Sequence, residues 1–564
     1  MFRKNNVSNE QMNLFSKEGY WTKYQQKRIN ENWSGFFHDY IFPAIDEEPY
    51  RVFYSDNNAS CPNTPVNILV SLLIIKSLSN MTDEEIIDSL LFDQRTQYAV
   101  HTMDLDNQPI SKNMIGNFRS KIAKYEATSG INLFENTVSE LNDLILKLCD
   151  VDRSIERIDS MMISSSCKKL SRIELVYTVN YNFIKLLNSF NKVPSEFECY
   201  LNEKHKNEVI YRTRDKETDD KLTTLLSSSL KLYETFKDDK DVCESEEFKL
   251  LERMINDQYD GDNNKPKDNK DIKPDSLQTP VDPEATYRYK YKDNIGYVGN
   301  IVEANNNGNP MITDWDIDRN TKADTEFMKE YLDKQDNNAC NIKEDENNNC
   351  EENINIKVVD GAYYSEEIKK LGEEKGIDVH PTELVGKKVD NKNLLEFNID
   401  NKNYQVFECP NKIAPISSTY NEENHTICAK FDKQLCSKCP FRDKCAVDTS
   451  SKKANTLRIT TEKLNNAVQK SNMNNAEYQK ISNTRAAIEG IPSIIRRRYH
   501  IDTRANKGKV YLKMEFSAAI LSINIKRASK MASLDLNSGI FSLKVYLEDI
   551  FFKVAAKFYI KWCF

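Results

Sequence analysis

The chain has 564 residues, of which 39% are hydrophobic and 29% charged, with a formal net charge of −8. This composition is typical of a globular protein of roughly two to four domains and excludes a chain that coats nucleic acid uniformly. The N-terminus lacks an apolar secretory segment, and no apolar run is long enough to span a bilayer. We therefore expect a cytoplasmic protein with no membrane contact, whose thirteen cysteines are thiols or metal ligands rather than disulfides.

Residues 1–150 are predicted to form a helical N-terminal domain. A continuous apolar run begins at Pro65, and Thr82-Asp-Glu-Glu85 resembles a capping box at the start of the next helix. Two further amphipathic helices are expected, from Asn113 and over 133–148. A plain helical bundle and a DNA-binding or dimerisation head are both open, because Arg119 and its neighbours form only a modest basic patch.

Residues 151–405 alternate between strand and helix patterns, which predicts an α/β fold with a mixed sheet flanked by helices. A β-type segment up to residue 166 precedes a helical region over 170–248. Alternating residues over 287–318 indicate a meander, and the segment 355–381 reads as strand, helix and strand. Polar stretches near 255–285 and 336–353 are expected to be flexible inserts. The remaining predicted parts are a cysteine-rich module at 406–450, the C-terminal part of the α/β domain at 451–535 and an amphipathic C-terminal helix at 536–564.

The cysteine-rich module has spacing typical of a metal site. Cys436, Cys439 and Cys445 lie within ten residues of one another, and Cys409 or Cys428 would complete a tetrahedral set of thiolates. His425 is a weaker candidate. A structural Zn²⁺ is the first interpretation, while an iron–sulfur cluster or reduced thiols without metal are the alternatives.

Three acids from separate segments are candidates for catalysis. Asp159 and Asp360 each close a short β-type run, and Glu489 lies in a predicted helix among arginines. Carboxylates suit Mg²⁺, and two such ions about 3.5–4 Å apart stabilise the attacking and leaving oxygens of a phosphodiester displacement. The sequence therefore indicates metal-dependent cleavage of a phosphodiester backbone. Asp152 is an alternative to Asp159, and a turn, a cap or an exposed ion pair is the structural alternative for each acid.

Cations outnumber acids between residues 485 and 527, which places a phosphate-binding surface near Glu489. Arginine suits this role because its guanidinium is permanently charged and can bind phosphate with two parallel hydrogen bonds. The candidate phosphate contacts are Arg485, Arg496, Arg497, Arg498, Arg504 and Lys507.

These motifs together resemble the DDE-type transposases of bacterial insertion sequences, in particular the IS1182-like group within the wider IS4/IS5-like group. Asp159-Ser-Met matches the family's Asp-Ser-Thr-like motif, and Asp360-Gly-Ala-Tyr matches its Asp-x-x-Tyr motif. Arg485, Glu489 and Arg496 occupy the Arg, Glu and Lys places of the signature Tyr-x₂-Arg-x₃-Glu-x₆-Lys.

One place of this signature departs from the family. Ser482 stands where the family has Tyr, and Tyr478 lies one helical turn earlier. The family's cysteine pattern begins with Cys-Pro, which favours Cys409 as the fourth ligand of a structural Zn²⁺.

The resemblance implies an RNase H-like catalytic domain in which Asp159, Asp360 and Glu489 hold two Mg²⁺ or Mn²⁺ ions. It also implies double-stranded DNA as partner, namely terminal inverted repeats and target DNA, a homodimer in the synaptic complex and association with the nucleoid. Two rivals are a catalytically inactive or domesticated DNA-binding descendant and another RNase H-like nuclease. Strand transfer would separate the transposase from both.

Overall fold

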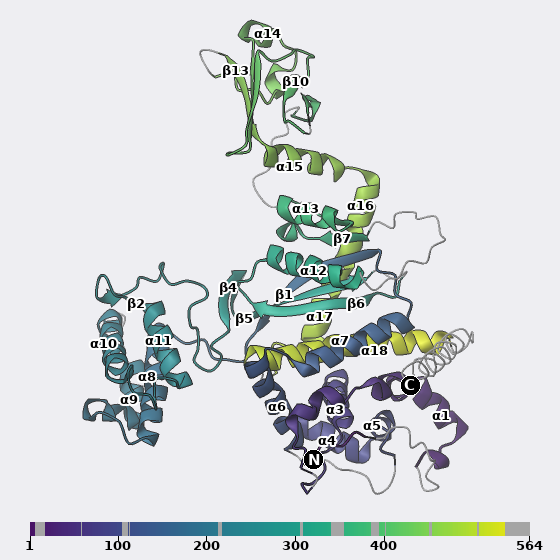
Figure 1. The fold of residues 1–564 in the computed structure, drawn as a ribbon, viewed down its shortest axis with the longest axis vertical. Helices are drawn as coiled ribbons and strands as arrows, with labels where there is room; N and C mark the ends of the chain where they lie inside the picture. The colour runs from purple at the N-terminus through teal and green to yellow at the C-terminus, as the bar shows by residue number, and fades with distance from the viewer. Residues whose placement is uncertain are drawn as a thin grey trace, which may run out of the picture. The chain divides into compact units, whose positions relative to one another are not determined.

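The protein, seen in a computed structural model (Figure 1), divides into two compact units. The first comprises Met1–Asp152, Ser160–Lys322 and Gly490–Phe564, and the second comprises Arg153–Asp159 and Ala323–Glu489. Strand β1 (Ile155–Ser164) therefore contributes its first half to the second unit and its second half to the first. The structure describes residues 1–5, 17–57, 59–103, 111, 113–211, 217–290, 292–304, 308–339, 355–384, 394–400, 402–450, 454–504 and 507–535.

The N-terminal part of the first unit is helical, as predicted. Helix α3 (Val66–Ser79) is apolar around its circumference and almost wholly buried, as expected for the central helix of a bundle. The predicted capping box precedes α4 (Asp83–Phe92): the Glu85 N–H donates to Thr82 Oγ1 at 3.2 Å, and the Thr82 N–H donates to Glu85 Oε2 at 2.7 Å. The other helices here are α1 (Lys23–Asn30), α2 (Trp33–Phe36), α5 (Gln94–Ala99), α6 (Met114–Ser129) and α7 (Leu133–Leu148).

Helix α18 (Lys509–Asp535) joins this helical region to the sheet of the first unit. It packs against α3 and α7, which Figure 1 shows beside it, and against strand β6 (Met311–Arg319). The side chain of Asn524, fully buried on α18, donates from Nδ2 to the Ile312 carbonyl at 2.7 Å. Pairing of this kind removes the cost of burying polar groups between helix and sheet.

The predicted meander is confirmed as three antiparallel strands, β4 (Thr286–Lys290), β5 (Lys292–Ala304) and β6. The first part of β5 pairs with β4 and the rest with β6, and β1 lies beside β5. A Cβ added at Gly299 on β5 would lie 2.9 Å from the Phe516 ring of α18. Glycine at this place therefore allows the helix to approach the sheet closely.

Three helices between β1 and β4, namely α8 (Arg172–Ser189), α10 (Thr218–Phe236) and α11 (Glu246–Gln258), share a core of their own, which includes the fully buried Phe183 and Leu226. The prediction of a flexible insert near 255–285 is corrected, because this segment holds a short hairpin and the buried residues Leu277 and Asp282. Its polar side chains find partners inside the protein, as Asp282 does by accepting a hydrogen bond from the Tyr297 hydroxyl. The other elements here are α9 (Glu203–Lys206), β2 (Tyr259–Asp260) and β3 (Lys265–Pro266).

In the second unit the first half of β1 pairs in parallel with β7 (Asn355–Val359), and β7 pairs in parallel with β8 (Ile377–Pro381). Helix α13 (Glu366–Glu374) connects β7 to β8, so the predicted strand, helix and strand are confirmed. The unit also contains α12 (Asp324–Ala339), α15 (Thr461–Asn472), α16 (Ala476–Asn483) and the 3₁₀ segments η8 (Gly361–Tyr363), η9 (Leu394–Glu396) and η11 (Thr484–Glu489).

The cysteine-rich part of the second unit contains two small antiparallel sheets, one of two strands and one of three, and a core in which Ile427, Ala429 and Leu457 are fully buried. Its elements are β9 (Asn398–Ile399), β10 (Val406–Glu408), β11 (Ser417–Asn421), β12 (Thr426–Phe431), α14 (Lys433–Ser437), η10 (Arg442–Lys444) and β13 (Asn455–Thr460).

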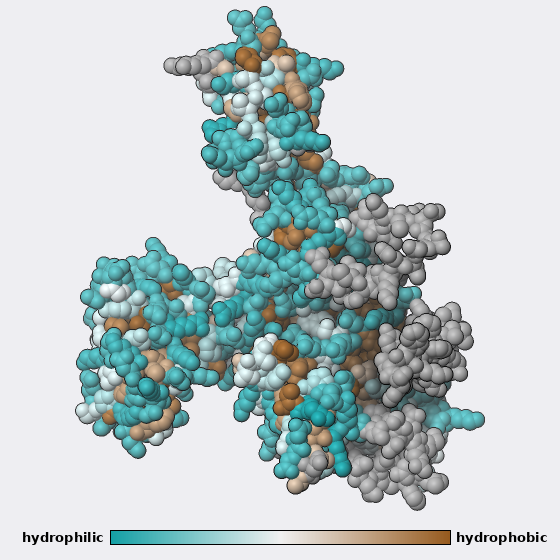
Figure 2. Space-filling model, in the orientation of Figure 1, coloured by the Kyte–Doolittle hydropathy of each residue, from teal (hydrophilic) through white to brown (hydrophobic). Residues whose placement is uncertain are grey.

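The architecture is a mixed α/β fold with parallel and antiparallel strand pairs and an N-terminal helical region, as predicted in outline. The expected insert near 336–353 falls largely, and the expected helix over 536–564 wholly, outside the described residues. On the face shown in Figure 2, hydrophilic residues cover most of the surface, and apolar residues gather only in small patches. Within the described ranges, no helix combines the length and apolar character needed to cross a bilayer.

Candidate active site

The parallel pairing of β1 with β7 determines where two of the predicted acids lie. Glu156 on β1 stands opposite Lys357 on β7. Asp159 and Asp360 each lie three residues farther along, so the same register continued brings them side by side where β7 ends. In open α/β sheets, ligands bind at the carboxyl ends of the parallel strands.

Beneath these acids lies a buried charge cluster that the sequence analysis did not identify. The Glu156 side chain has no exposed surface, and its carboxylate accepts hydrogen bonds from Lys357 Nζ at 2.6 Å and Arg153 Nε at 2.8 Å. The Tyr331 hydroxyl donates a third hydrogen bond to it. Burial raises the pKa of Glu156, but Lys357 and Arg153 outweigh burial and lower this pKa to about 2. The available signal for this cluster was Lys357, a charged residue among the apolar residues of β7.

Arg485 connects the two candidate acids. Its Nη2 atom lies 3.1 Å from Asp159 Oδ1 and 3.8 Å from Asp360 Oδ2. Its Nε atom is buried and has no hydrogen-bond acceptor among the described residues. The preceding carbonyl, that of Thr484, accepts from Arg157 Nη1 at 2.8 Å, which ties the start of η11 to β1. The Arg485 guanidinium thus contacts both carboxylates, and its Nε donor has no acceptor among the described residues.

Glu489 closes the same 3₁₀ segment, which contacts β7. The buried side chain of Ile488 anchors this segment, whereas Glu489 itself is exposed. In the part of the chain that the structure describes, no three His, Cys, Asp or Glu side chains are arranged as a metal site. The structure therefore brings Asp159 and Asp360 together, and Glu489 does not join them in this conformation.

The two candidates for the missing signature tyrosine both contact His380 at the end of β8. The Tyr478 ring stacks on the His380 ring with centroids 3.5 Å apart, and Ser482 Oγ lies 3.1 Å from His380 Nε2. The Tyr478 hydroxyl donates to the Pro381 carbonyl at 2.7 Å and accepts from Gln469 Nε2 at 2.8 Å. Helix α16, which precedes η11, is therefore held against strand β8 by these contacts.

The other predicted phosphate contacts belong to the first unit and differ in their surroundings. Arg496 donates to Asp502 Oδ2 at 3.1 Å and to the Met162 carbonyl at 2.7 Å. Arg504 forms an ion pair with the buried Glu515, so it already has an internal partner. The remaining three have exposed side chains: Arg497, Arg498 and Lys507.

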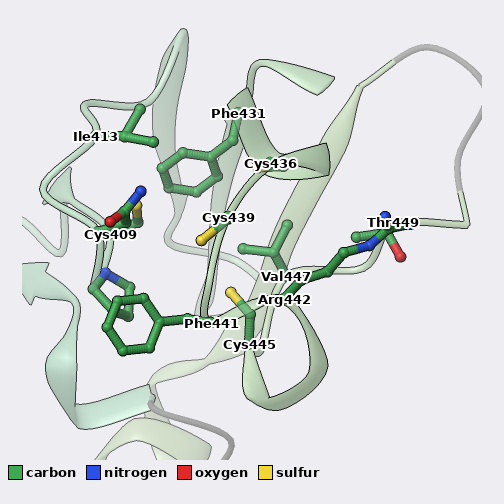
Figure 3. Close-up of a pocket in the computed structure, with 12 residues that line it drawn as sticks. Cys409, Ile413, Phe431, Cys436, Cys439, Phe441, Arg442, Cys445, Val447 and Thr449 are labelled. Carbon is green, nitrogen blue, oxygen red and sulfur yellow. The ribbon is translucent and has the colours of Figure 1, made fainter. Parts of the chain in front are cut away.

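The four cysteines of the predicted zinc site line one cavity, together with Phe431 and Phe441 (Figure 3). The cavity has a volume of about 20 Å³, which is room for one water-sized guest. Burial raises the pKa of the Cys445 thiol, and charge on the other three cysteines raises it further, as their proximity requires. Cys428 and His425 are not among the residues that line this cavity. The four cysteines are Cys409, Cys436, Cys439 and Cys445.

Residues 408–529 match the family model described as a transposase DDE domain. The matched span contains the four cysteines, Arg485 and Glu489, whereas Asp159 and Asp360 precede it. No curated protein and no solved structure matches the chain. The match over residues 408–529 therefore supports a DDE-type transposase.

Proposed function

We propose that this protein is a transposase of a bacterial insertion sequence of the IS1182-like group, with an RNase H-like catalytic domain. It would bind double-stranded DNA at terminal inverted repeats, act as a homodimer when two ends are paired, and catalyse strand cleavage and strand transfer. The observation that carries this proposal is that Asp159 and Asp360 share Arg485, in a chain that also contains a transposase DDE domain.

The residues at this site fit divalent metal ions. Two carboxylates lie side by side next to Arg485, and their oxygens are the ligands that Mg²⁺ or Mn²⁺ prefers. Asp159, Asp360 and Glu489 would hold the ions, with Glu489 moving inward from its exposed position on η11. Bound ions would activate the attacking water or 3′-hydroxyl and stabilise the leaving oxygen.

Arg485 would orient the substrate. Its Nη2 holds the two carboxylates, and its Nε is a buried donor without an acceptor, as a side chain that contacts a phosphate oxygen requires. The flanking phosphates would be held by a set of cations, which position the DNA without reading its sequence. These are Arg496, Arg497, Arg498, Arg504 and Lys507, of which Arg496 and Arg504 would first have to leave their carboxylate partners.

A structural Zn²⁺ in the cysteine cavity is a second part of this proposal. The cavity has the volume for one small guest, and thiolates in a set of four are the usual ligands of structural zinc. Cys409, Cys436, Cys439 and Cys445 would rotate inward to bind it. Metal analysis of the purified protein should find about one zinc per chain, and Cys439→Ser should lose that zinc and lower the melting temperature. Intact thiols without zinc would contradict this site.

Strand transfer tests the proposed function. Purified protein, a duplex that ends in the element's inverted repeat, a plasmid target and Mg²⁺ should yield covalent joints between the duplex 3′-end and the plasmid. Asp159→Asn protein at the same concentration is the matched control and should yield none. Cleavage without joints would indicate a nuclease instead, and specific binding without cleavage would indicate an inactive DNA-binding descendant.

A further inference from the structure

A basic groove lies on the first unit, between α1, α2, α17 (Gly490–Tyr499) and α18. Its volume is about 500 Å³. On α18 the groove is lined by Lys526, Ser529, Lys530 and Ser533, which follow at intervals of three, one and three residues and so share one face of the helix. Ala528 and Ala532, which alternate with them, are buried and hold α18 in place.

Four cations converge on this groove. They are Arg28 from α1, Arg498 from α17, and Lys526 and Lys530 from α18. Glu31 is the single carboxylate of the lining, and it has a partner of its own in Lys27 at 3.6 Å. Among the described residues, none of the four cations has a carboxylate within ion-pair distance of 4.0 Å.

Another charged groove of the same unit contains its own carboxylate partners. There Lys76 pairs with Asp83 at 2.9 Å and with Glu515 at 3.1 Å. Arg119 also pairs with both carboxylates, and Arg504 pairs with Glu515. That groove is neutralised from within and has no need of an anion.

The position of Lys526 supports the same contrast. Its Nζ atom donates to the Leu78 carbonyl and lies 5.3 Å from the centre of the Tyr499 ring, so the side chain is held at the base of the groove. Burial lowers the pKa of Lys526, and the like charge of Arg498 lowers it further, to about 8. A nearby anion would relieve this repulsion.

We infer that this groove binds consecutive phosphates of a DNA backbone. Arginine can donate two parallel hydrogen bonds to a phosphate, and lysine supplies point charge. The hydroxyls of Ser529 and Ser533 donate to the Lys526 and Lys530 carbonyls in this structure and would have to rotate to donate to a phosphate. The inference rests on the proposed function, in which the chain acts on DNA, and it assigns a DNA-contacting role to Arg28, Lys526 and Lys530.

Binding of a labelled duplex of mixed sequence, measured at several salt concentrations, tests this inference. Arg28→Ser combined with Lys530→Ser should weaken binding on the order of tenfold and reduce the slope of log K against log salt by about 1 for each lost contact. The matched control is Lys23→Ser with Lys185→Ser, which removes two exposed cations that do not line the groove. Both double variants should melt at the wild-type temperature, because all four side chains are exposed.

Affinity and salt slope equal to those of the control would overturn the inference. So would a loss of binding to polyglutamate while DNA affinity is unchanged, because the groove would then serve an acidic protein. The proposed function is judged separately, by metal-dependent cleavage with the wild-type protein at saturating DNA. If the wild-type protein did not cleave, the proposed enzymatic function would be contradicted, whereas the measured effect of the groove variants on DNA binding would still stand.

Discussion

Two charged sites lie three residues apart along β1 and β7, and they differ in how deeply their carboxylates are buried. At the inner site, Glu156 is fully buried and is matched by Lys357, Arg153 and the Tyr331 hydroxyl. At the outer site, Asp159 and Asp360 are partly exposed and share one arginine. A buried carboxylate requires such partners, whereas partly exposed carboxylates at the end of a strand can bind ions from solution.

The same contrast holds among the cations of the first unit. Lys76 and Arg504 are neutralised by Glu515, whereas Arg28 and Lys530 face an open groove without carboxylate partners among the described residues. The cations that are paired with Glu515 therefore stabilise the fold. The cations that line the open groove are placed to bind an anionic ligand.

The largest expected effect is on catalysis at the outer site. Asp360→Asn removes a metal ligand with little change in volume, so the cleavage rate should fall by at least about 1,000-fold, equivalent to about 4 kcal/mol in the barrier. Single-turnover cleavage of a duplex that carries the element's end provides the measurement. Because Asp360 is partly exposed, its unfolding free energy should stay within about 0.5 kcal/mol of wild type. A variant that cleaves at the wild-type rate would remove Asp360 from the site.

The inner site should respond in the opposite way, through stability. Lys357→Met leaves the buried Glu156 without its nearest cation and should lower the free energy of unfolding by about 3–5 kcal/mol. Denaturant unfolding measures this loss. In the double variant with Glu156→Gln no buried charge is left unpaired, so it should lose less than the sum of the single variants. A loss below about 1 kcal/mol in Lys357→Met would show that the pair does not fix the strands.

The free energy of unfolding should also depend on pH through Glu156 of the inner site. The pKa of Glu156 is held near 2 in the folded protein, below the ordinary value of 4.5, so the unfolded chain binds more protons between these values. The stabilisation is complete above about pH 4.5 and is lost as the pH falls towards 2, a change of about 3 kcal/mol. Stability curves against pH for wild type and Glu156→Gln should differ in slope within this window. Parallel curves would refute the assigned pKa.

A smaller effect is expected where α16 is fastened to β8. Tyr478→Phe keeps the stacking on His380 but removes the hydroxyl that bonds Pro381 and Gln469. The unfolding free energy should fall by about 1–2 kcal/mol, the usual cost of leaving such partners unpaired. Ser482→Ala should cost less, because it removes a single contact to His380. Equal losses in the two variants would mean that the tyrosine hydroxyl has no special role.

Much of the fold could be predicted from local sequence patterns. The capping box at Thr82, the meander over 287–318 and the strand, helix and strand over 355–381 are all present, because each depends on residues close together in the chain. The ordered structure of the polar segment near 255–285 could not be predicted from local sequence patterns. Its aspartates and asparagines resemble a flexible linker, yet Asp282 is buried by a partner that lies fifteen residues away.

For the candidate site, the sequence indicates which residues to consider but not how they are arranged in space. Motif spacing indicates Asp159, Asp360 and Arg485, but their proximity depends on a parallel register between segments about 200 residues apart. The pairing of Glu156 with Lys357 depends on the same register, and so the sequence alone could not reveal it. The internal partner of Arg504 was hidden for the same reason.

The most direct test of the metal site is cleavage at the boundary of the element's inverted repeat in Mg²⁺, with wild type compared with Glu489→Ala. Glu489 is exposed, so the variant should fold and bind the same DNA as tightly as wild type. We expect wild type to cut at the repeat boundary and the variant to lose that cleavage. Cleavage at the wild-type rate by Glu489→Ala would contradict the three-acid site.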